Sequence, residues 1–331
     1  MLTRRAFLNT AVCVSVAAMA PGFPQNAVAQ QYPTKPVRIM VGYAPGGGVD
    51  TTARIVAAGL GELWGGTVIV ENRPGAAGNV ATEVTAKAAP DGYTLVLCNI
   101  GTHGITPARF AGKLTYDPIR DFAFPAMIGG VPNVFMVHPS MPAKTLKQFI
   151  AYAKANPGKV NFGSSGVGAS PHMSIELLKS MTGINIVHVP YKGAAIALSD
   201  VISGHIESSV GKQAGGPLGA IKAGRLRALG VTSAKRNVQL PEVPTFAEAA
   251  VPGYDVTGWY GICTQSKVPQ PILARLNADL NTLMNGPALR KRLEEQGIEV
   301  TPSTPEQFVE HVKREIAKWT KVVREAGLAA E

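Results

Sequence analysis

The stretch "VRIMVGYAPGGGVDTTARIVAAGLGELW", residues 37–64, decides the fold class of this chain. Residues 37–43 are apolar and rich in branched side chains, which predicts a buried β-strand. Residues 50–64 carry apolar side chains at helical spacing, which predicts an amphipathic helix. Three consecutive glycines, Gly46 to Gly48, join the strand to the helix. A strand that passes into a helix through such a loop is typical of α/β proteins.

The same alternation continues in two sets. Strands are predicted at 67–72 and 93–99 with a helix at 79–89 between them, and a second set begins with a strand within 128–137. Strands without polar alternation, separated by helices, predict parallel sheets covered by helices. We therefore expect an α/β fold of two lobes with a ligand cleft between them.

Two segments differ from this pattern. Residues 103–132 hold four prolines and little periodicity, so we expect them to be irregular up to the start of the second set. Residues 271–327 show helical periodicity, and we expect two amphipathic helices there.

The amino terminus resembles an export signal. Arg4 and Arg5 precede an apolar run at 11–20, and small residues at 27–29 suit a signal peptidase. A twin-arginine pair in this position is an address read by an export receptor. We expect residues 1–29 to be cleaved and the mature chain to be periplasmic.

Composition excludes several classes of protein. A length of 331 residues suits about two domains, at roughly 100–200 residues each. The formal charge is +10, but the basic residues are scattered among acids, which argues against nucleic acid as a partner. A positive surplus still attracts small anions.

Export permits a disulfide, but Cys98 and Cys263 lie far apart in the sequence, and we expect buried free thiols.

The three glycines predict an anion site. Ligands of open α/β sheets bind where strands end and helices begin. Glycine lets backbone N–H groups face a ligand, and a helix start adds free donors. A phosphate loop needs Gly-Lys-Ser/Thr, whereas Val49 and Asp50 follow here, and Thr51 replaces the last glycine of a dinucleotide fingerprint. Asp50 is the expected N-cap of the helix.

A second loop repeats the arrangement. The sequence "SSGVGASPH", residues 164–172, follows the predicted strand 160–165 and precedes a predicted helix at 171–183. Ser170 is the expected N-cap, and Pro171 suits the first helical position. We call residues 44–48 the glycine loop and residues 164–169 the serine loop. Two facing loops of backbone donors would bind a carboxylate.

Several motifs together resemble a known family. The chain is similar to the Bug family, the TctC-type periplasmic solute-binding receptors of tripartite tricarboxylate transporters. The resemblance covers nearly the whole mature chain and rests on "YAPGGGVDTTAR", "VENRPGAAGNVATE", "APDGYTL", "SSGVGASPHMS", "VHVPYKGAAIAL", "IKAGRLRALGVTS" and "LPEVPTFAEA".

The resemblance implies a type II periplasmic-binding-protein fold whose lobes close on a small carboxylate. Lobe 1 would comprise residues 30–131 and 254–331, and lobe 2 residues 132–253. Strand crossovers near 130–133 and 251–256 would form the hinge. The implied partners are that carboxylate and the membrane subunits of the transporter; we expect a monomer without cofactors. The residues implied in ligand binding are Tyr43, Gly47, Gly48, Asp50, Thr102, Ser165, Gly168, Ala169, Ser170, His172, Lys192 and Lys212.

One position departs from the family pattern. Gly211 stands where relatives often have an acid, which argues against a ligand that carries an ammonium group. Lys212 follows it and could instead bind a second carboxylate.

Two alternative functions remain open. The same binding protein could serve a sensor pathway. A periplasmic hydrolase is the other alternative, although no G-x-S-x-G elbow occurs, and a dispersed Ser-His-Asp set is recognised only by geometry. The six histidines show no metal-binding spacing, so no metal site is expected.

Overall fold

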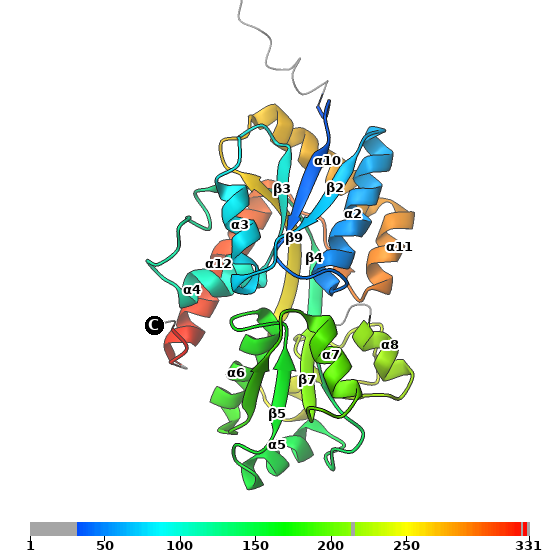
Figure 1. Cartoon of the computed structure of the whole chain (residues 1–331), viewed down its shortest axis with the longest axis vertical. Coiled ribbons are helices and arrows are strands. Elements are labelled where there is room, and N and C mark those ends of the chain that lie inside the picture. Colours follow the sequence, from blue (N-terminus) through cyan, green and yellow to red (C-terminus); the bar gives the residue numbers. More distant parts are fainter. Residues whose placement is uncertain (1–31, 213–215, 326, 330–331) are drawn as a thin grey trace, which may run out of the picture.

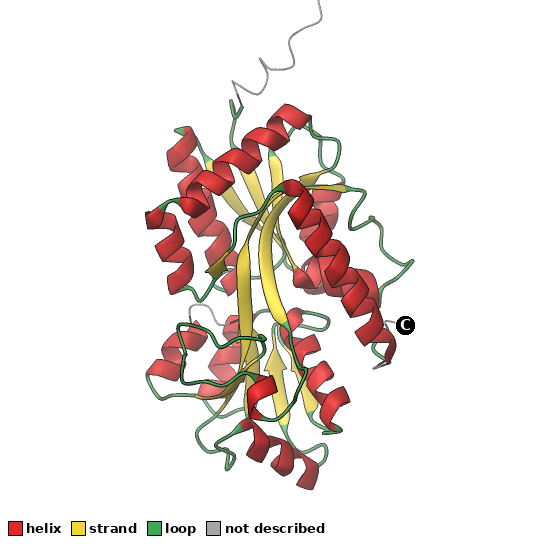
Figure 2. Ribbon diagram, turned by 180° about the vertical axis from the view of Figure 1, so that it is seen from behind, coloured by secondary structure: helices red, strands yellow, loops and turns green. Residues whose placement is uncertain are grey.

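The protein folds into two α/β lobes, as the sequence predicts (Figure 1). The computed structural model describes residues 32–212, 216–325 and 327–329. The predicted export signal lies outside these residues, so its cleavage stays a prediction. Two long strands, β4 (Phe122–Val137) and β9 (Thr257–Gln265), lie where the lobes meet (Figure 2).

Lobe 1 contains a mixed sheet between two layers of helices. Strands β2, β1 and β3 run parallel, and β9 is antiparallel to β3. The strands of this part are β1 (Val37–Val41), β2 (Val68–Asn72), β3 (Thr94–Asn99) and β10 (Glu299–Val300). Its helices are α2 (Gly48–Trp64), η1 (Ala76–Gly78), α3 (Asn79–Ala86), η2 (Gly101–Ile105), α4 (Thr106–Arg109), α10 (Gln270–Asn285), α11 (Pro287–Glu295) and α12 (Pro305–Glu325). In the described part of the chain three helices, not the two expected, follow residue 269.

Lobe 2 repeats the plan with a smaller sheet. Strands β5 and β6 run parallel to each other and β5 to β7, and β4 is antiparallel to β7 and β8. The strands are β5 (Asn161–Ser164), β6 (Val187–Pro190), β7 (Ser208–Lys212) and β8 (Arg227–Val231). The helices are α5 (Leu146–Ala155), α6 (Ser170–Thr182), α7 (Ala194–Ile202), α8 (Gly216–Lys222) and α9 (Phe246–Ala249).

Strand β4 connects the two sheets, and it overturns the expectation of an irregular segment up to residue 128. It begins at Phe122, because an irregularity between Ala123 and Ala126 accommodates Pro125. Proline lacks the N–H that a regular ladder needs, so it hides a strand from pattern analysis. From Phe122 to Pro132 the strand pairs with β9, and from Asn133 onward it pairs with β7. The predicted lobe boundaries stay a prediction.

A disulfide joins Cys98 of β3 to Cys263 of β9, so the expectation of free thiols was wrong. In the antiparallel ladder Cys98 lies opposite Gly261, and Cys263 lies opposite Val96. The two cysteines are therefore diagonal neighbours on one face of the sheet, with Cα atoms 5.9 Å apart. That separation suits a disulfide, and only the folded pairing of β3 with β9 reveals it.

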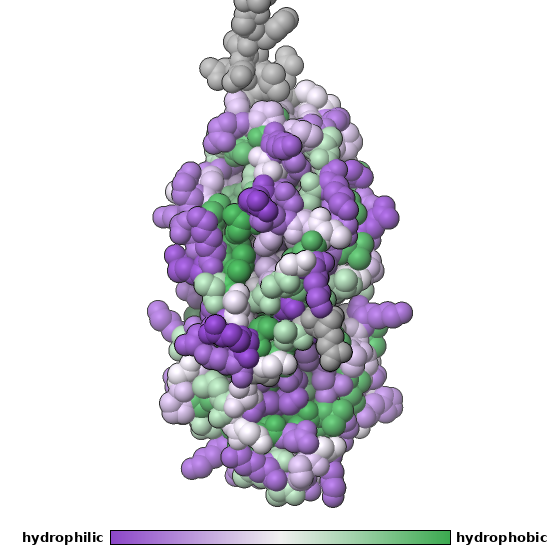
Figure 3. Space-filling model, turned by 90° about the vertical axis from the view of Figure 1, so that its left-hand side faces the viewer, coloured by the Kyte–Doolittle hydropathy of each residue, from purple (hydrophilic) through white to green (hydrophobic). Residues whose placement is uncertain are grey.

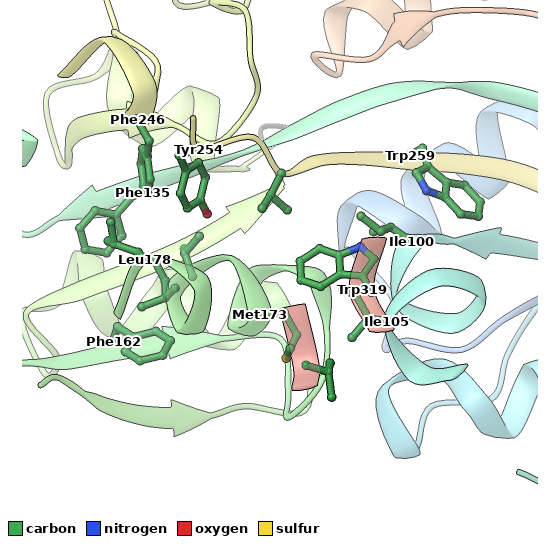
Figure 4. Close-up of a cluster of buried hydrophobic side chains, with 14 of the residues drawn as sticks. Ile100, Ile105, Phe135, Phe162, Met173, Leu178, Phe246, Tyr254, Trp259 and Trp319 are labelled. Carbon is green, nitrogen blue, oxygen red and sulfur yellow. The ribbon is translucent and has the colours of Figure 1, made fainter. Parts of the chain in front are cut away.

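The buried core continues from one lobe into the other. One cluster includes Phe135 and Met173 of lobe 2 together with Ile100, Trp259 and Trp319 of lobe 1 (Figure 4). Separate clusters fill the α2 side of lobe 1 and the α7 side of lobe 2. On the face shown in Figure 3, apolar residues form small groups among hydrophilic ones. Within the described ranges, no helix has the length and apolar character needed to span a bilayer.

Candidate functional site

Helix α2 begins directly at the glycine loop without a side-chain cap. Its N-cap is Gly47, and Asp50 is the third residue of the helix, so the prediction of Asp50 as N-cap was wrong. The first intrahelical bond runs from Thr51 N–H to Gly47 C=O. The N–H groups of the first turn precede that bond and have no intrahelical acceptor. The positive end of the helix dipole therefore lies at the glycine loop.

Asp50 holds the glycine loop in place from behind. Its carboxylate accepts hydrogen bonds from Gly46 N–H at 2.9 Å, Arg54 Nε at 3.0 Å and Asn72 Nδ2 at 2.9 Å. Asn72 also donates to Tyr43 C=O at 3.0 Å. Burial raises the pKa of Asp50, but these bonds outweigh it and leave the pKa below its ordinary value. Asp50 is thus ionised, and its hydrogen bonds hold the glycine loop in its conformation.

Glycine is required for its conformation at only one position of this loop. Gly46 has φ +84°, whereas Gly47 has φ −83° and ψ 167°, which any residue can adopt. A Cβ at Gly47 would come no closer than 3.9 Å to another protein atom, the Ala44 carbonyl oxygen. The space in front of Gly47 is therefore open to a ligand.

Helix α6 begins one residue earlier than predicted. Its N-cap is Ala169, which leaves Ser170 and Pro171 as the first two helical residues, so Ser170 is not the N-cap. The Ser170 hydroxyl oxygen instead accepts a hydrogen bond from Asn133 Nδ2 at 3.0 Å. No side chain caps the helix start. Ser170 N–H is left without an intrahelical acceptor.

Three amides of the serine loop are already hydrogen-bonded, and the first is Gly166 N–H, which donates to Ser164 Oγ at 3.2 Å. Gly168 N–H donates to His172 Nδ1 at 3.1 Å, and Ala169 N–H donates to Gly166 C=O at 3.3 Å. Ser165 is half-buried at the turn. The loop is thus closed on itself, and its free donor on the helix side is Ser170 N–H.

A serine–histidine pair lies beneath this loop. Ser164 Oγ lies 2.7 Å from His188 Nε2, and the His188 ring stacks on His172 with centroids 3.9 Å apart. Burial and the His172 charge lower the pKa of His188 to about 3, so the ring is neutral. Ser164 is fully buried, and no carboxylate within the described ranges bonds to His188. A hydrolytic triad needs an accessible serine and an acid that orients the base, and neither is present there.

The two loops lie on facing edges of the lobes. A Cβ on Gly101 would lie 3.2 Å from the Tyr43 hydroxyl and 4.0 Å from Ser170 N. A Cβ on Gly193, the N-cap of α7, would lie 3.4 Å from Ala44 Cβ. The structure therefore brings Tyr43 of lobe 1 near Ser170 of lobe 2.

Tyr43 and Thr102 both use their hydroxyl groups in hydrogen bonds within lobe 1. Tyr43 donates to Ala77 C=O at 2.8 Å, and burial raises the pKa of Tyr43 to about 12, against a smaller lowering effect of Asn99. The Thr102 hydroxyl is 2.9 Å from His103 Nδ1 and 3.2 Å from Asn99 N, and it is buried. Thr102 therefore shapes the turn after β3.

The two candidate lysines occupy opposite environments. Lys192 is exposed in the turn before α7. The ammonium group of Lys212 is buried, lies 5.3 Å from the centre of the Tyr260 ring, and has no hydrogen-bond partner within the described residues. Among the candidates, Lys212 is the one cation placed at the junction of the lobes.

Three residues near the loops were missed by the sequence analysis. The guanidinium group of Arg109 lies against Gly168, because a Cβ there would overlap Arg109 Nη1. Asn99 and Tyr260 face each other across β3 and β9, and both carry a buried polar atom without a partner among the described residues. No sequence signal marks them, since each comes from a different strand or helix. The described residues contain no cluster of ligands that could hold a metal ion.

A comparison with known protein families shows to which family this chain belongs. Residues 52–328 match the model of the tripartite tricarboxylate transporter family receptor, TctC. The chain belongs to this family. The resemblance inferred from the glycine and serine loops is therefore confirmed, and the family consists of periplasmic solute-binding receptors.

Solved structures of similar proteins confirm the two-lobed periplasmic-binding-protein fold. The chain is 35% identical to Rpa4515 of R. palustris with adipate, with a TM-score of 0.86, covering 90% of this chain and 99% of that one. It is 29% identical to the periplasmic binding protein BugD, with a TM-score of 0.85 and coverage of 91% and 100%. It is 30% identical to MatC from Rhodopseudomonas palustris with bound malate, with a TM-score of 0.82 and coverage of 88% and 100%.

Proposed function

We propose that this protein is an extracytoplasmic receptor that captures a small carboxylate between its lobes. The observation that carries the proposal is the pair of uncapped helix starts, α2 and α6, on facing edges of the two lobes. Free N–H groups and helix dipoles at such positions favour a bound anion. Two similar proteins are named with adipate and malate, which are both carboxylates.

The carboxylate would be held mainly by backbone groups. Gly47 leaves open space in front of the first turn of α2, and Ser170 N–H is the free donor of the opposite loop. The lobes would hinge where β4 changes partner, between Pro132 and Asn133, and where the chain returns before β9. The receptor would act as a monomer, without turnover, and pass its ligand to the membrane subunits of a tripartite tricarboxylate transporter.

Ligand-dependent stability tests the binding role. The purified protein is heated with mono-, di- and aromatic carboxylates, and a ligand is expected to raise the melting temperature. At a hundredfold excess over Kd the added stability is about 2.7 kcal/mol. If none of these carboxylates raises the melting temperature, the proposal fails. X-ray scattering with the best ligand then tests lobe closure, which predicts a smaller radius of gyration.

Export and delivery have their own tests. Lysine at both Arg4 and Arg5 is expected to leave the protein in the cytoplasm, because the twin-arginine address is lost. Cells that lack the receptor are expected to lose uptake of the labelled ligand. Uptake unchanged by its loss would favour a sensor role.

A further inference from the structure

Buried polar atoms without partners gather where the two sheets meet. Asn99 Nδ2, Lys212 Nζ, Tyr260 OH and Asn133 Oδ1 all lack a hydrogen-bond partner within the described residues. Most buried polar groups in proteins are hydrogen-bonded, and a group left unpaired is costly. Several unpaired groups in one place indicate a site that a ligand completes.

The fold places these atoms at the ends of strands. Lys212 is the last residue of β7 and lies opposite Asn133 of β4. Its ammonium group extends over the Tyr260 ring of β9, and a Cβ at Gly258 would overlap it. Asn99 is the last residue of β3 and lies opposite Tyr260. Asn133 in turn bonds to Ser170 at the start of α6, so the cluster adjoins the serine loop.

Three of the four atoms are donors. Asn99 Oδ1 accepts the N–H groups of Gly101 at 2.8 Å and Thr102 at 3.4 Å, which fixes the amide and leaves Nδ2 as a donor. The ammonium group of Lys212 can only donate, and the Tyr260 hydroxyl can also donate. Asn133 Oδ1 is an acceptor and suits a water molecule or a ligand hydroxyl. A cation with two neutral donors is a suitable environment for a carboxylate.

We propose that Lys212 selects dicarboxylates by binding the second carboxylate of the ligand, with Asn99 and Tyr260 as neutral partners. The proposal rests on the proposed function, in which the helix starts of α2 and α6 bind the first carboxylate. Gly211 supports it, because this position next to Lys212 carries no acid that would repel the ligand.

The protonation state of Lys212 gives the proposal a second measurable consequence, a pH dependence of ligand binding. Burial lowers the pKa of Lys212 to about 7, against a smaller opposing effect of the Glu315 charge on α12. The other ionisable group against it is Tyr260, whose pKa burial raises, so Tyr260 stays neutral. An anion beside the ammonium group raises the pKa of Lys212 again, so dicarboxylate binding takes up about half a proton at pH 7. The affinity is therefore expected to fall as the pH rises above 7.

The test compares Lys212→Met with the wild type by titration calorimetry. The probes are succinate, glutarate and adipate, each paired with the monocarboxylate of the same length: butyrate, valerate and hexanoate. The wild type is expected to prefer at least one dicarboxylate, and Lys212→Met to lose about a hundredfold in affinity for it while monocarboxylate binding changes less than twofold. Proton uptake, measured in buffers of different ionisation enthalpy, is expected to vanish in the variant.

A stability measurement separates this role from a structural one. Lys212→Met removes a buried unpaired ammonium group, so the ligand-free melting temperature is expected to rise by a few degrees. The control is Lys154→Met on the far helix α5, where the lysine is exposed. Neither the melting temperature nor the affinity for the dicarboxylate is expected to change in this control. A variant that keeps the dicarboxylate preference overturns the role of Lys212 alone. A wild type that binds none of the six probes overturns the proposed function and this inference together.

Discussion

The glycine loop and the serine loop follow one plan but use their amides in opposite ways. In the glycine loop a side chain, Asp50, binds Gly46 N–H from behind, and the first turn of α2 is left open. In the serine loop the N–H groups of Gly168 and Ala169 are already hydrogen-bonded, and Arg109 of the other lobe packs on it. Sequence similarity between two loops therefore does not mean that they offer a ligand the same donors.

The largest effect is expected from Gly47→Val. Its backbone angles suit valine and no protein atom lies closer than 3.9 Å to the new Cβ, so the fold should tolerate it. The side chain would project into the space assigned to the ligand, and we expect at least a hundredfold loss of affinity, about 2.7 kcal/mol. Calorimetry measures the affinity for the ligand, and urea unfolding measures the unfolding free energy.

The matched control for that substitution is Gly66→Val after α2. A Cβ at Gly66 is also 3.9 Å from its nearest protein atom, the Trp64 carbonyl oxygen. It should change neither affinity nor stability. Equal affinities for Gly47→Val and Gly66→Val would show that the ligand does not approach the glycine loop.

A pair of alanine substitutions compares the surroundings of the two loops. Gly46 and Gly168 have nearly the same φ, +84° and +80°, so alanine is strained at both by about 1–2 kcal/mol. A Cβ at Gly46 has no protein atom within 4 Å, whereas one at Gly168 displaces Arg109. We expect Gly168→Ala to cost about 1 kcal/mol more in unfolding free energy. Equal costs in urea unfolding would show that the contact with Arg109 is immaterial.

Asp50→Asn tests whether the Asp50 carboxylate holds the glycine loop in its conformation. The asparagine side chain has the shape of the aspartate, but its NH2 group would face donors such as Gly46 N–H or Asn72 Nδ2. The lost hydrogen bonds should cost about 2 kcal/mol in unfolding free energy. Because the folded pKa of Asp50 is lowered, its contribution is complete above about pH 4 and is lost as the pH falls through the folded pKa. The difference between variant and wild type should therefore shrink below pH 4.

A surface carboxylate provides the reference for that measurement. Glu310→Gln breaks an exposed pair with Lys313, which solvent screens, and is expected to leave the unfolding free energy nearly unchanged. If Asp50→Asn costs no more than this, Asp50 does not hold the loop.

Among the substitutions at candidate site residues, the smallest effect is expected from Ser170→Ala. The substitution removes the hydroxyl that accepts from Asn133 but leaves Ser170 N–H in place, so stability should fall by about 1 kcal/mol and affinity by less than tenfold. A loss of affinity as large as that of Gly47→Val would mean that the serine hydroxyl, and not the backbone, contacts the ligand.

The fold could be predicted from the sequence because apolar strands, helical periods and glycine loops are local signals. Strand β4 was predicted too short, since Pro125 lies at an irregularity that only the paired strand β9 makes acceptable. The starts of α2 and α6 were misplaced because Asp50 and Ser170 look like N-caps but bond to partners elsewhere in the fold.

The two loops of the candidate site were also visible in the sequence, whereas its inner part was not. Asn99, Lys212 and Tyr260 lie on three strands far apart in the chain, and their common location follows from sheet pairing alone. Lys212 could be named from the sequence, but its burial could not, because an isolated lysine looks the same on a surface.

The disulfide between Cys98 and Cys263 has a consequence for covalent integrity. It closes a ring that spans 165 residues and contains the whole of lobe 2 together with the strands that lead into and out of it. A protease that cuts any one peptide bond between these cysteines therefore cannot separate the molecule into two pieces. Nicked protein would run as one chain on a non-reducing denaturing gel and as two fragments once a thiol reductant opens the ring.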